Sequence, residues 1–220
     1  MTSETPQPAP TARPRRGRQA EAARNDEAIL EAARAVLLRD PAASMATVAQ
    51  AAGVGVGGLY RRYAGREELL QRICGDGLRH FVALAETAVA DEGDAWGAFE
   101  AFVRGVVEAD VHALSARLAG TFTSTDELRR LATRSGGLVD EIVHRAQEAG
   151  DLRPDVSSAD LPMLFEQLTA VRVDDHGRTS ALRRRYLALH LDALRPGGTP
   201  LPDVPPPTSA ELRERWDRSH

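Results

Sequence analysis

Cysteine, lysine and long hydrophobic runs are scarce or missing in this chain of 220 residues. The one cysteine, Cys74, cannot form an internal disulfide or a cysteine-based zinc cluster, which excludes two classes of scaffold. No apolar run approaches the roughly 18 residues that span a bilayer, and no apolar segment follows a charged N-terminus as in a secretory leader. We therefore expect a cytoplasmic location and no membrane contact.

Basic charge comes entirely from arginine, which is distributed unevenly along the chain. Residues 11–80 carry 12 arginines against 8 acidic residues, whereas residues 81–220 carry 16 against 23. A basic N-terminal part attached to an acidic remainder suggests that the N-terminal part contacts a polyanion such as nucleic acid. A difference of this size also arises by chance in an arginine-rich chain, so the composition leaves both interpretations open.

The spacing of apolar residues predicts an all-α fold. Alanine, leucine and glutamate recur at helical spacing, and no alternating run of β-branched or aromatic residues lies between turns. Four prolines among the first 14 residues predict that residues 1–19 form a disordered basic arm. A second proline-rich segment predicts that residues 196–220 form an extended tail with one short helix, capped by Ser209.

Caps and helix breakers indicate where the helices begin and end. Asn25, which two acidic residues follow, favours a helix start, and Asp40 and Pro41 end that helix. Pro162 fits a helix only if that helix begins as late as Asp160. The expected helices span residues 25–39, 45–52, 56–63, 66–91, 94–114, 115–122, 126–149, 158–173 and 179–194.

Residues 44–63 combine two short helical patterns with a glycine between them. Ser44 is a favourable helix cap, and Gly53 suits the left-handed residue that ends a helix. The basic aromatic segment 60–62 (YRR) lies in the second pattern. This arrangement is typical of a helix-turn-helix, in which one helix supports another that enters the major groove of DNA.

The segments 44–54 (SMATVAQAAGV), 59–63 (LYRRY) and 65–70 (GREELL) resemble the DNA-binding domain of the tetracycline-repressor (TetR) family. The resemblance implies a helix-turn-helix domain over residues 20–66. It also implies a helical effector-binding and dimerisation domain over residues 67–195. Such a protein would be a homodimeric transcriptional repressor that binds a palindromic operator in double-stranded DNA and is released by a small apolar or amphipathic effector.

The same resemblance assigns DNA contacts residue by residue. Ser44 would place its hydroxyl near a phosphate, Tyr60 would reach the backbone or a thymine methyl, and the N-terminal arginines would follow the DNA or enter a minor groove. Gly55 and Gly58 stand where the family usually has hydroxyl residues, and three glycines in this segment predict a recognition helix that frays without DNA. The expected DNA contacts are Arg15, Arg16, Arg18, Ser44, Gly55, Val56, Gly57, Gly58, Tyr60, Arg61, Arg62 and Arg66.

By the same resemblance, helices beyond residue 80 would enclose an effector pocket, and the last two would form the dimer interface. Most of the expected lining is apolar, and each polar member can equally be a paired core residue. The expected pocket residues are Phe81, Trp96, Phe99, Val103, Val106, Asp110, His112, Phe122, Leu138, Ile142, His144, Phe165 and Arg172.

Two other functions are compatible with the sequence. A regulator of the same build could lack a small ligand or respond to a protein partner. The segment 53–58 (GVGVGG) also matches the G-x-G-x-x-G dinucleotide motif of enzymes, but a helical pattern precedes it where the motif requires a strand. No histidine pair has the helical spacing of a zinc site, so we expect no catalytic residue, metal or cofactor.

Overall fold

The computed structural model describes residues 15–118, 120–208, 210–212 and 214, and within them the protein is helical with no strand. The all-α prediction is therefore confirmed. In this part of the chain no helix is long and apolar enough to cross a membrane. The helices are α1 (Arg15–Arg39), α2 (Met45–Ala51), α3 (Val56–Arg62), α4 (Arg66–Ala90), α5 (Ala95–Glu108), α6 (Val111–Leu118), α7 (Asp126–Glu148), α8 (Asp160–Ala170) and α9 (His176–Ala193).

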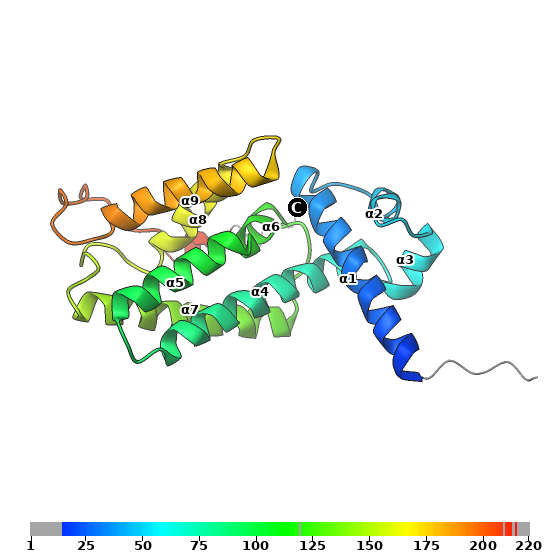
Figure 1. Cartoon of the computed structure of the whole chain (residues 1–220), viewed down its shortest axis with the longest axis horizontal. Coiled ribbons are helices and arrows are strands. Elements are labelled where there is room, and N and C mark those ends of the chain that lie inside the picture. The colour runs from blue at the N-terminus through cyan, green and yellow to red at the C-terminus, as the bar shows by residue number, and fades with distance from the viewer. Residues whose placement is uncertain (1–14, 119, 209, 213, 215–220) are drawn as a thin grey trace, which may run out of the picture.

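The helices form two groups that α4 joins (Figure 1). α1, α2 and α3 lie together at one end of the molecule. From there α4 runs beside α5 and α7, while α8 and α9 pack against α5. At 25 residues, α4 is about 37 Å long, long enough to belong to both groups.

Each group has its own hydrophobic core. The first core packs α1, α2 and α3 against the N-terminal half of α4, and it also takes apolar residues from α6 and the start of α7. The second core lies between the C-terminal half of α4 and α5, α7, α8 and α9. Burial of each large apolar side chain contributes about 1.5–3 kcal/mol to stability, so both cores hold α4 firmly. The most deeply buried residues of the first core include Ile29, Leu37, Leu59, Leu69 and Leu70.

Side-chain caps fix the starts of four helices. Ser44, Asp94, Thr125 and Asp175 each precede a helix and accept a hydrogen bond from a backbone N–H of its first turn. The first N–H groups of a helix have no partner within it, and an oxygen at the cap position supplies one. These caps explain why α2, α5, α7 and α9 begin where they do.

The C-terminal end of α4 is held by a side chain from another helix. Arg145 of α7 donates hydrogen bonds to the carbonyls of Ala88, Val89 and Asp91, at 3.3, 2.8 and 2.5 Å. The last carbonyls of a helix lack a following turn to bond with, and a cation is favourable at this end of the helix dipole. Arg145 therefore ties α7 to the end of α4.

The first helix begins at Arg15 and not at the predicted cap, Asn25. The residues that precede Asn25, 20–24 (AEAAR), consist of strong helix formers that extend the helix upstream. Residues 15–19 of the predicted disordered arm are therefore helical. The rest of that arm, residues 1–14, lies outside the described residues.

The predicted helix over residues 94–114 is interrupted at Asp110, whose φ angle is 50°. This left-handed conformation is uncommon for residues other than glycine but is tolerated best by Asn and Asp. It ends α5 at Glu108, and α6 begins at Val111. The Asp110 carboxylate pairs with the buried Arg183 of α9 at 2.8 Å, which holds the chain in this turn. The predicted boundaries at 114 and 115 are wrong for this reason. The predicted end at 122 is wrong as well, because α6 ends at Leu118 and Gly120 has a left-handed φ angle of 72°.

Two helix starts in the second group differ from the prediction by a few residues. α8 begins at Asp160, so Pro162 falls in the first turn, where its missing N–H costs no hydrogen bond. The predicted start at residue 158 is therefore two residues early. α9 begins at His176, three residues before the predicted start, because the Asp175 side chain accepts a hydrogen bond from the N–H of Arg178.

The proline-rich segment 196–208 contains no helix and is tied to the second group. The Arg153 guanidinium pairs with Asp155 at 2.5 Å and donates to the carbonyl of Thr199 at 2.8 Å. Asp155 in turn accepts the N–H of Leu201 at 3.1 Å. The predicted cap of the last turn, residue 209, lies outside the described residues, and Thr208 makes the capping bond to the N–H of residue 211.

Candidate nucleic-acid interface

α2 and α3 form a helix-turn-helix that packs on α1 and α4. The Ser44 hydroxyl accepts the N–H of Thr47 at 3.1 Å and starts α2. Gly53 has a φ angle of 67°, which glycine adopts without strain, and it turns the chain from α2 toward α3. Leu59 is fully buried, so one face of α3 is fixed against the core. The motif predicted from the sequence is therefore present with its predicted cap and turn.

The opposite face of α3 is exposed. Val56 is 41% exposed and Tyr60 is 49% exposed, and the Arg61 side chain is exposed as well. Residues four apart in a helix lie one above the other, so Val56 and Tyr60 share one face. An aliphatic, an aromatic and a guanidinium group therefore project from a short helix that the core holds in place. A short helix with an exposed face of this kind can fit into the major groove of DNA.

Three glycines without side chains, Gly55, Gly57 and Gly58, leave free space on the surface around α3. Gly55 and Gly58 line an open groove of about 560 Å³ between α3 and α1. A Cβ at Gly55 would meet no atom within 4 Å, and Cβ atoms at Gly57 and Gly58 would lie 3.9 and 3.7 Å from the flexible Arg61 guanidinium. None of the three has a positive φ angle. Packing and backbone strain among the described residues therefore do not explain why these positions are glycine.

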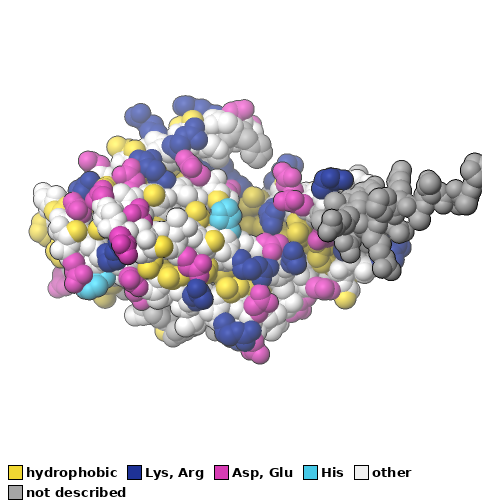
Figure 2. Space-filling model, turned by 60° about the horizontal axis from the view of Figure 1, so that its bottom comes forward, with side chains coloured by type: hydrophobic (Ala, Val, Ile, Leu, Met, Phe, Trp, Pro, Cys, Tyr) yellow, Lys and Arg dark blue, Asp and Glu magenta, His cyan; other side chains and the backbone are white. Residues whose placement is uncertain are grey.

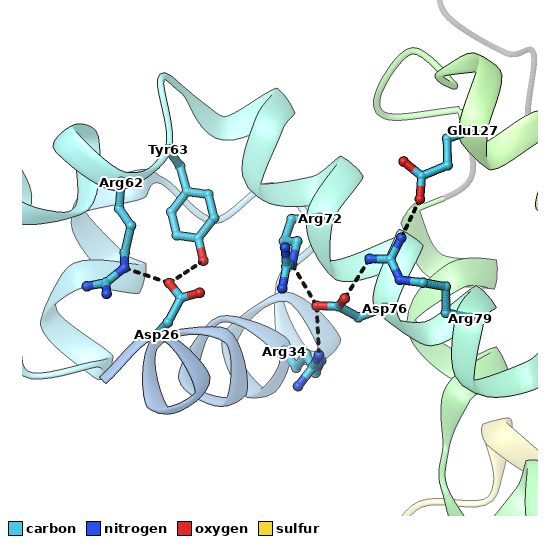
Figure 3. A network of polar contacts seen from close by, with 8 residues as sticks. All are labelled: Asp26, Arg34, Arg62, Tyr63, Arg72, Asp76, Arg79 and Glu127. Atoms are coloured by element: carbon cyan, nitrogen blue, oxygen red, sulfur yellow. Dashed lines mark hydrogen bonds and ion pairs between the residues drawn. The ribbon is translucent and has the colours of Figure 1, made fainter. Parts of the chain in front are cut away.

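Arg62 and Tyr63, at the end of α3, are engaged within the protein (Figure 3). The Asp26 carboxylate of α1 pairs with Arg62 Nε at 2.7 Å and accepts the Tyr63 hydroxyl at 2.9 Å. Burial, together with the hydrogen bond and the charge of Asp26, raises the pKa of Tyr63 to about 12. Asp26 thus fixes α3 on α1, a role that sequence reasoning missed.

Arg66 and Ser44 both lie beside the turn that precedes α2. The Arg66 guanidinium donates a hydrogen bond to the carbonyl of Pro41. Ser44 is exposed, and its hydroxyl lies 2.9 Å from that of Thr47. Arg66 therefore ties the start of α4 to the loop between α1 and α2, while Ser44 faces solvent.

The N-terminal arginines belong to α1 and not to a separate arm. Arg15, Arg16 and Arg18 lie in its first turn, and this end of α1 projects away from the rest of the molecule (Figure 1). Farther along the molecule, charges of both signs are mixed with hydrophobic side chains on the face that Figure 2 shows.

Comparison with known families matches both halves of the chain. The family described as "Bacterial regulatory proteins, tetR family" matches residues 29–73. The family described as "Transcriptional regulator SbtR-like, C-terminal domain" matches residues 94–196. The chain belongs to the TetR family of transcriptional regulators. A comparison with curated proteins finds no match.

Solved structures of TetR-family proteins share the fold. A TetR regulatory protein from Mycobacterium vanbaalenii is 26% identical, with a TM-score of 0.53 over 80% of this chain and 98% of that one. The ketosteroid regulator KstR2 of Mycobacterium tuberculosis is 21% identical, with a TM-score of 0.58 over 79% and 96%. LfrR of Mycobacterium smegmatis, solved in complex with proflavine, is 21% identical, with a TM-score of 0.55 over 81% and 99%.

In this TetR-family chain the glycine segment 53–58 does not have the context of a dinucleotide site. It follows helix α2 and leads into α3, whereas the dinucleotide motif requires a preceding strand. Among the described residues no cluster of histidine, cysteine and acidic side chains could hold a metal ion. The segment belongs to the helix-turn-helix.

Most of the predicted effector-pocket residues form the second core of this TetR-family protein. Phe81 packs edge-on against Phe165, with ring centroids 6.5 Å apart, and the His112 ring lies 5.5 Å from that of Phe165. The void beside His112 and Phe165 is about 10 Å³, roughly the space of one water molecule. The residues that pack in this core or against it are Phe81, Trp96, Phe99, Val103, Val106, Leu138, Ile142 and Phe165.

Four predicted pocket residues lie elsewhere in the fold. Phe122 belongs to the first core, beside α4 and α6. His144 is exposed on α7 and pairs with Glu148 at 3.2 Å, so it points away from the interior. Arg172 is exposed and donates to the carbonyl of Leu38 at 3.1 Å, across to α1. Asp110 is the turn residue described above. For these residues helical spacing alone did not indicate which way the side chain points.

A second polar network, also missed from the sequence, joins the two groups of helices (Figure 3). The Asp76 carboxylate of α4 lies 3.7 Å from Arg34 of α1, 3.0 Å from Arg72 and 2.7 Å from Arg79. Arg79 continues to Glu127 of α7 at 2.7 Å. The only sequence signal was the spacing of Arg72, Asp76 and Arg79 on one helix face. The network links α1 to α7 through α4.

Proposed function

We propose that this TetR-family regulator is a homodimeric repressor that inserts the two copies of α3 into successive major grooves of a palindromic DNA operator. The observation that carries the proposal is the exposed face of α3, with Val56, Tyr60 and Arg61 projecting over a buried Leu59. A two-fold symmetric dimer presents two such faces, which requires two half-sites about one helical turn apart.

The contacts to DNA divide by chemistry. Tyr60 and Arg61 read bases, since an aromatic ring packs on a thymine methyl and a guanidinium forms two hydrogen bonds with guanine. Ser44 and the arginines at the start of α1 bind phosphates, which fix the position of the protein on DNA. Arg62 and Arg66 support the interface indirectly. Their bonds to Asp26 and to the Pro41 carbonyl hold α3 and α4 in position.

We further propose that α8 and α9 form the dimer interface. Tyr186 and Leu189 of α9 are 41% and 58% exposed, and they lie three residues apart on one helix face. Exposed large apolar residues of this kind are typical of a surface that a partner covers. A second copy of the chain buries them in a four-helix bundle.

Release by a small molecule is the regulatory part of the proposal. An effector that binds more tightly to the form whose two α3 helices do not match the operator weakens DNA binding, and only that difference in affinity matters. The complex of the related LfrR with proflavine supports a small-molecule effector here. The alternative is a regulator of the same build without a small ligand. The small void in the second core, about 10 Å³, favours this alternative.

A gel-shift assay with promoter fragments that flank the gene tests the DNA-binding proposal. Tyr60→Ala and Arg61→Ala should each weaken binding to the specific fragment about 5- to 150-fold, which corresponds to about 1–3 kcal/mol for a lost base contact. Arg130→Ala, an exposed arginine of α7, is the matched control and should leave binding unchanged. A wild-type dimer that selects no fragment, or α3 variants that bind as the wild type does, would refute the proposal.

The salt dependence separates phosphate contacts from base contacts. Arg18→Ala should weaken binding to all fragments alike and reduce the slope of log K against log salt by about 1, because one phosphate contact is lost. Arg61→Ala should instead weaken binding to the preferred fragment more than to others. The reverse pattern would exchange the roles that we assign to these two arginines.

A further inference from the structure

A cleft of about 820 Å³ lies between the two groups of helices, on the side of α1 away from α3. It is bounded by the last turns of α1, the turn between α5 and α6, and the connection that leads from α8 into α9. In Figure 1 the end of α1 and the start of α9 approach each other at this place. Ligand sites occur preferentially at such domain interfaces, with volumes of about 300–1,000 Å³. The small void in the second core lies beside this cleft, since Val107 and Arg183 line both.

Buried Arg183 forms one wall of the cleft, and each of its three guanidinium nitrogens has a partner within the protein. It pairs with Asp110 at 2.8 Å and donates to the carbonyls of Val171 and Thr169, at 3.2 and 3.1 Å. Arg183 is 6% exposed, so these bonds stabilise the wall from within the protein. The binding capacity of the cleft therefore comes from its other charged residues.

Three more arginines line the cleft with donors to spare. Arg39 ends α1 and Arg184 lies in α9, and neither forms an ion pair or hydrogen bond with another described residue. Arg172 uses one nitrogen for its bond to the Leu38 carbonyl, which leaves the remaining donors of its planar group. The lining also contains two exposed carboxylates, Glu108 and Asp174, whose negative charges offset two of these three positive charges. The unpaired charge of the cleft is thus positive by one.

The same cleft has an apolar part. Leu38 and Val107 line it from α1 and α5, and Val173 lies in the connection between α8 and α9. Val173 is 46% exposed, one of the few large apolar residues that the described protein leaves uncovered. Positive charge from guanidinium groups beside an apolar surface is complementary to a molecule with one anionic group and a hydrocarbon body.

We propose that this cleft binds a small amphipathic anion, with its carboxylate or phosphate on Arg39, Arg172 and Arg184 and its apolar part on Leu38 and Val173. Guanidinium groups suit both anions because their donors form paired bonds with two oxygens. The site itself does not depend on DNA binding. Its consequence does rest on the proposed function: a ligand that bridges α1 and α9 fixes the position of the helix-turn-helix relative to the rest of the protomer and thereby changes operator affinity.

Calorimetric titration of the full chain tests the site without DNA. The probes are decanoate, decyl phosphate, decylammonium and inorganic phosphate, each below its aggregation threshold. Decanoate or decyl phosphate should bind saturably, more tightly than inorganic phosphate, and decylammonium should not bind. In the double variant Arg39→Gln/Arg184→Gln the affinity for the anion should fall at least ~10-fold, as expected for lost charged hydrogen bonds. Arg130→Gln, an exposed arginine of α7 outside both the cleft lining and the proposed dimer interface, is the control and should bind as the wild type does.

Three results would overturn the proposal: no saturable anion binding, equal binding of decylammonium, or equal binding in the double variant and the wild type. Saturable binding of decanoate or decyl phosphate that is tighter than that of inorganic phosphate and decylammonium, together with weakening confined to the double variant, supports it. A gel shift with the saturating anion then tests the consequence. If the ligand-free wild-type protein binds no operator, the proposed function is contradicted. The calorimetric result on the cleft would still stand.

Discussion

Replacing Gly57 or Gly58 by alanine should separate the stability of α3 from its fit to DNA. Both lie inside a helix, where glycine is about 1 kcal/mol less favourable than alanine. A Cβ at either position meets only the flexible guanidinium of Arg61, at 3.9 or 3.7 Å, so the folded protein has room for it. Each substitution should therefore stabilise α3 by up to about 1 kcal/mol. For a chain of this size that corresponds to a rise in Tm of about 2–4 °C.

DNA affinity should change in the opposite direction. If the glycines are present because α3 lies close to the DNA, an added methyl group holds the helix away from the groove. The expected loss is about 5- to 150-fold in operator affinity, or about 1–3 kcal/mol, similar to a mismatched base pair. Thermal unfolding followed by circular dichroism gives the stability, and fluorescence anisotropy with a labelled operator fragment gives the affinity.

Gly136 and Gly137 of α7 supply the matched control. Both are exposed helical glycines with no atom within 4 Å of an added Cβ. Their alanine variants should raise Tm in the same way without changing operator affinity. If the α3 variants bind DNA as tightly as the wild type, close approach to DNA is not the reason for the glycines. If the Gly57 or Gly58 variants lower Tm, the folded protein does not have room for a Cβ at these positions, contrary to our inference.

Three further results follow from the polar and buried groups. Asp26→Asn should destabilise the protein by about 1–2 kcal/mol, measured by urea unfolding, because Arg62 and Tyr63 lose a charged partner. In the same variant the pKa of Tyr63 should fall below about 12 but stay raised by burial, and an unchanged ultraviolet titration would count against the assigned bond. Cys74, whose pKa burial raises to about 12, should react with a thiol reagent only after unfolding, and rapid labelling of the native protein would contradict its burial. The pKa of Asp155 is lowered chiefly by its paired guanidinium, so its contribution to stability is present above the unfolded pKa of about 3.9 and is lost as the pH falls through the lower folded value. Asp155→Asn should reduce the acid sensitivity of unfolding below that pH, and an identical pH profile would refute this assignment.

The helix-turn-helix was the most predictable part of the fold because its signals are local. The Ser44 cap and the left-handed Gly53 lie next to the boundaries that they set, and α2 and α3 were predicted to within one residue at each end. The start of α1 was missed for the complementary reason. Asn25 has the chemistry of a cap, but the alanine-rich sequence upstream has enough helix propensity that the helix extends to residues before Asn25.

Other features were unpredictable because they depend on residues far apart in the chain. The break at Asp110 is stabilised by Arg183, more than seventy residues later, and no local pattern reveals that pair. The exposed His144 and the core residue Ile142 are two positions apart on α7, and spacing did not decide which of them faces inward. The cleft that Arg39 and Arg184 share is likewise created only when α1 and α9 come together.

The attachment of Arg145 to the end of α4 determines how that helix can move. Because three carbonyls at this end are bonded to α7, sliding of α4 along its own axis would break them, whereas tilting about them would not. For a helix about 37 Å long, a tilt of about 5° displaces the opposite end by about 3 Å. That opposite end carries Arg66 and the helix-turn-helix. Any tilt of α4 that keeps the Arg145 bonds would therefore displace the helix-turn-helix more than any other part of α4.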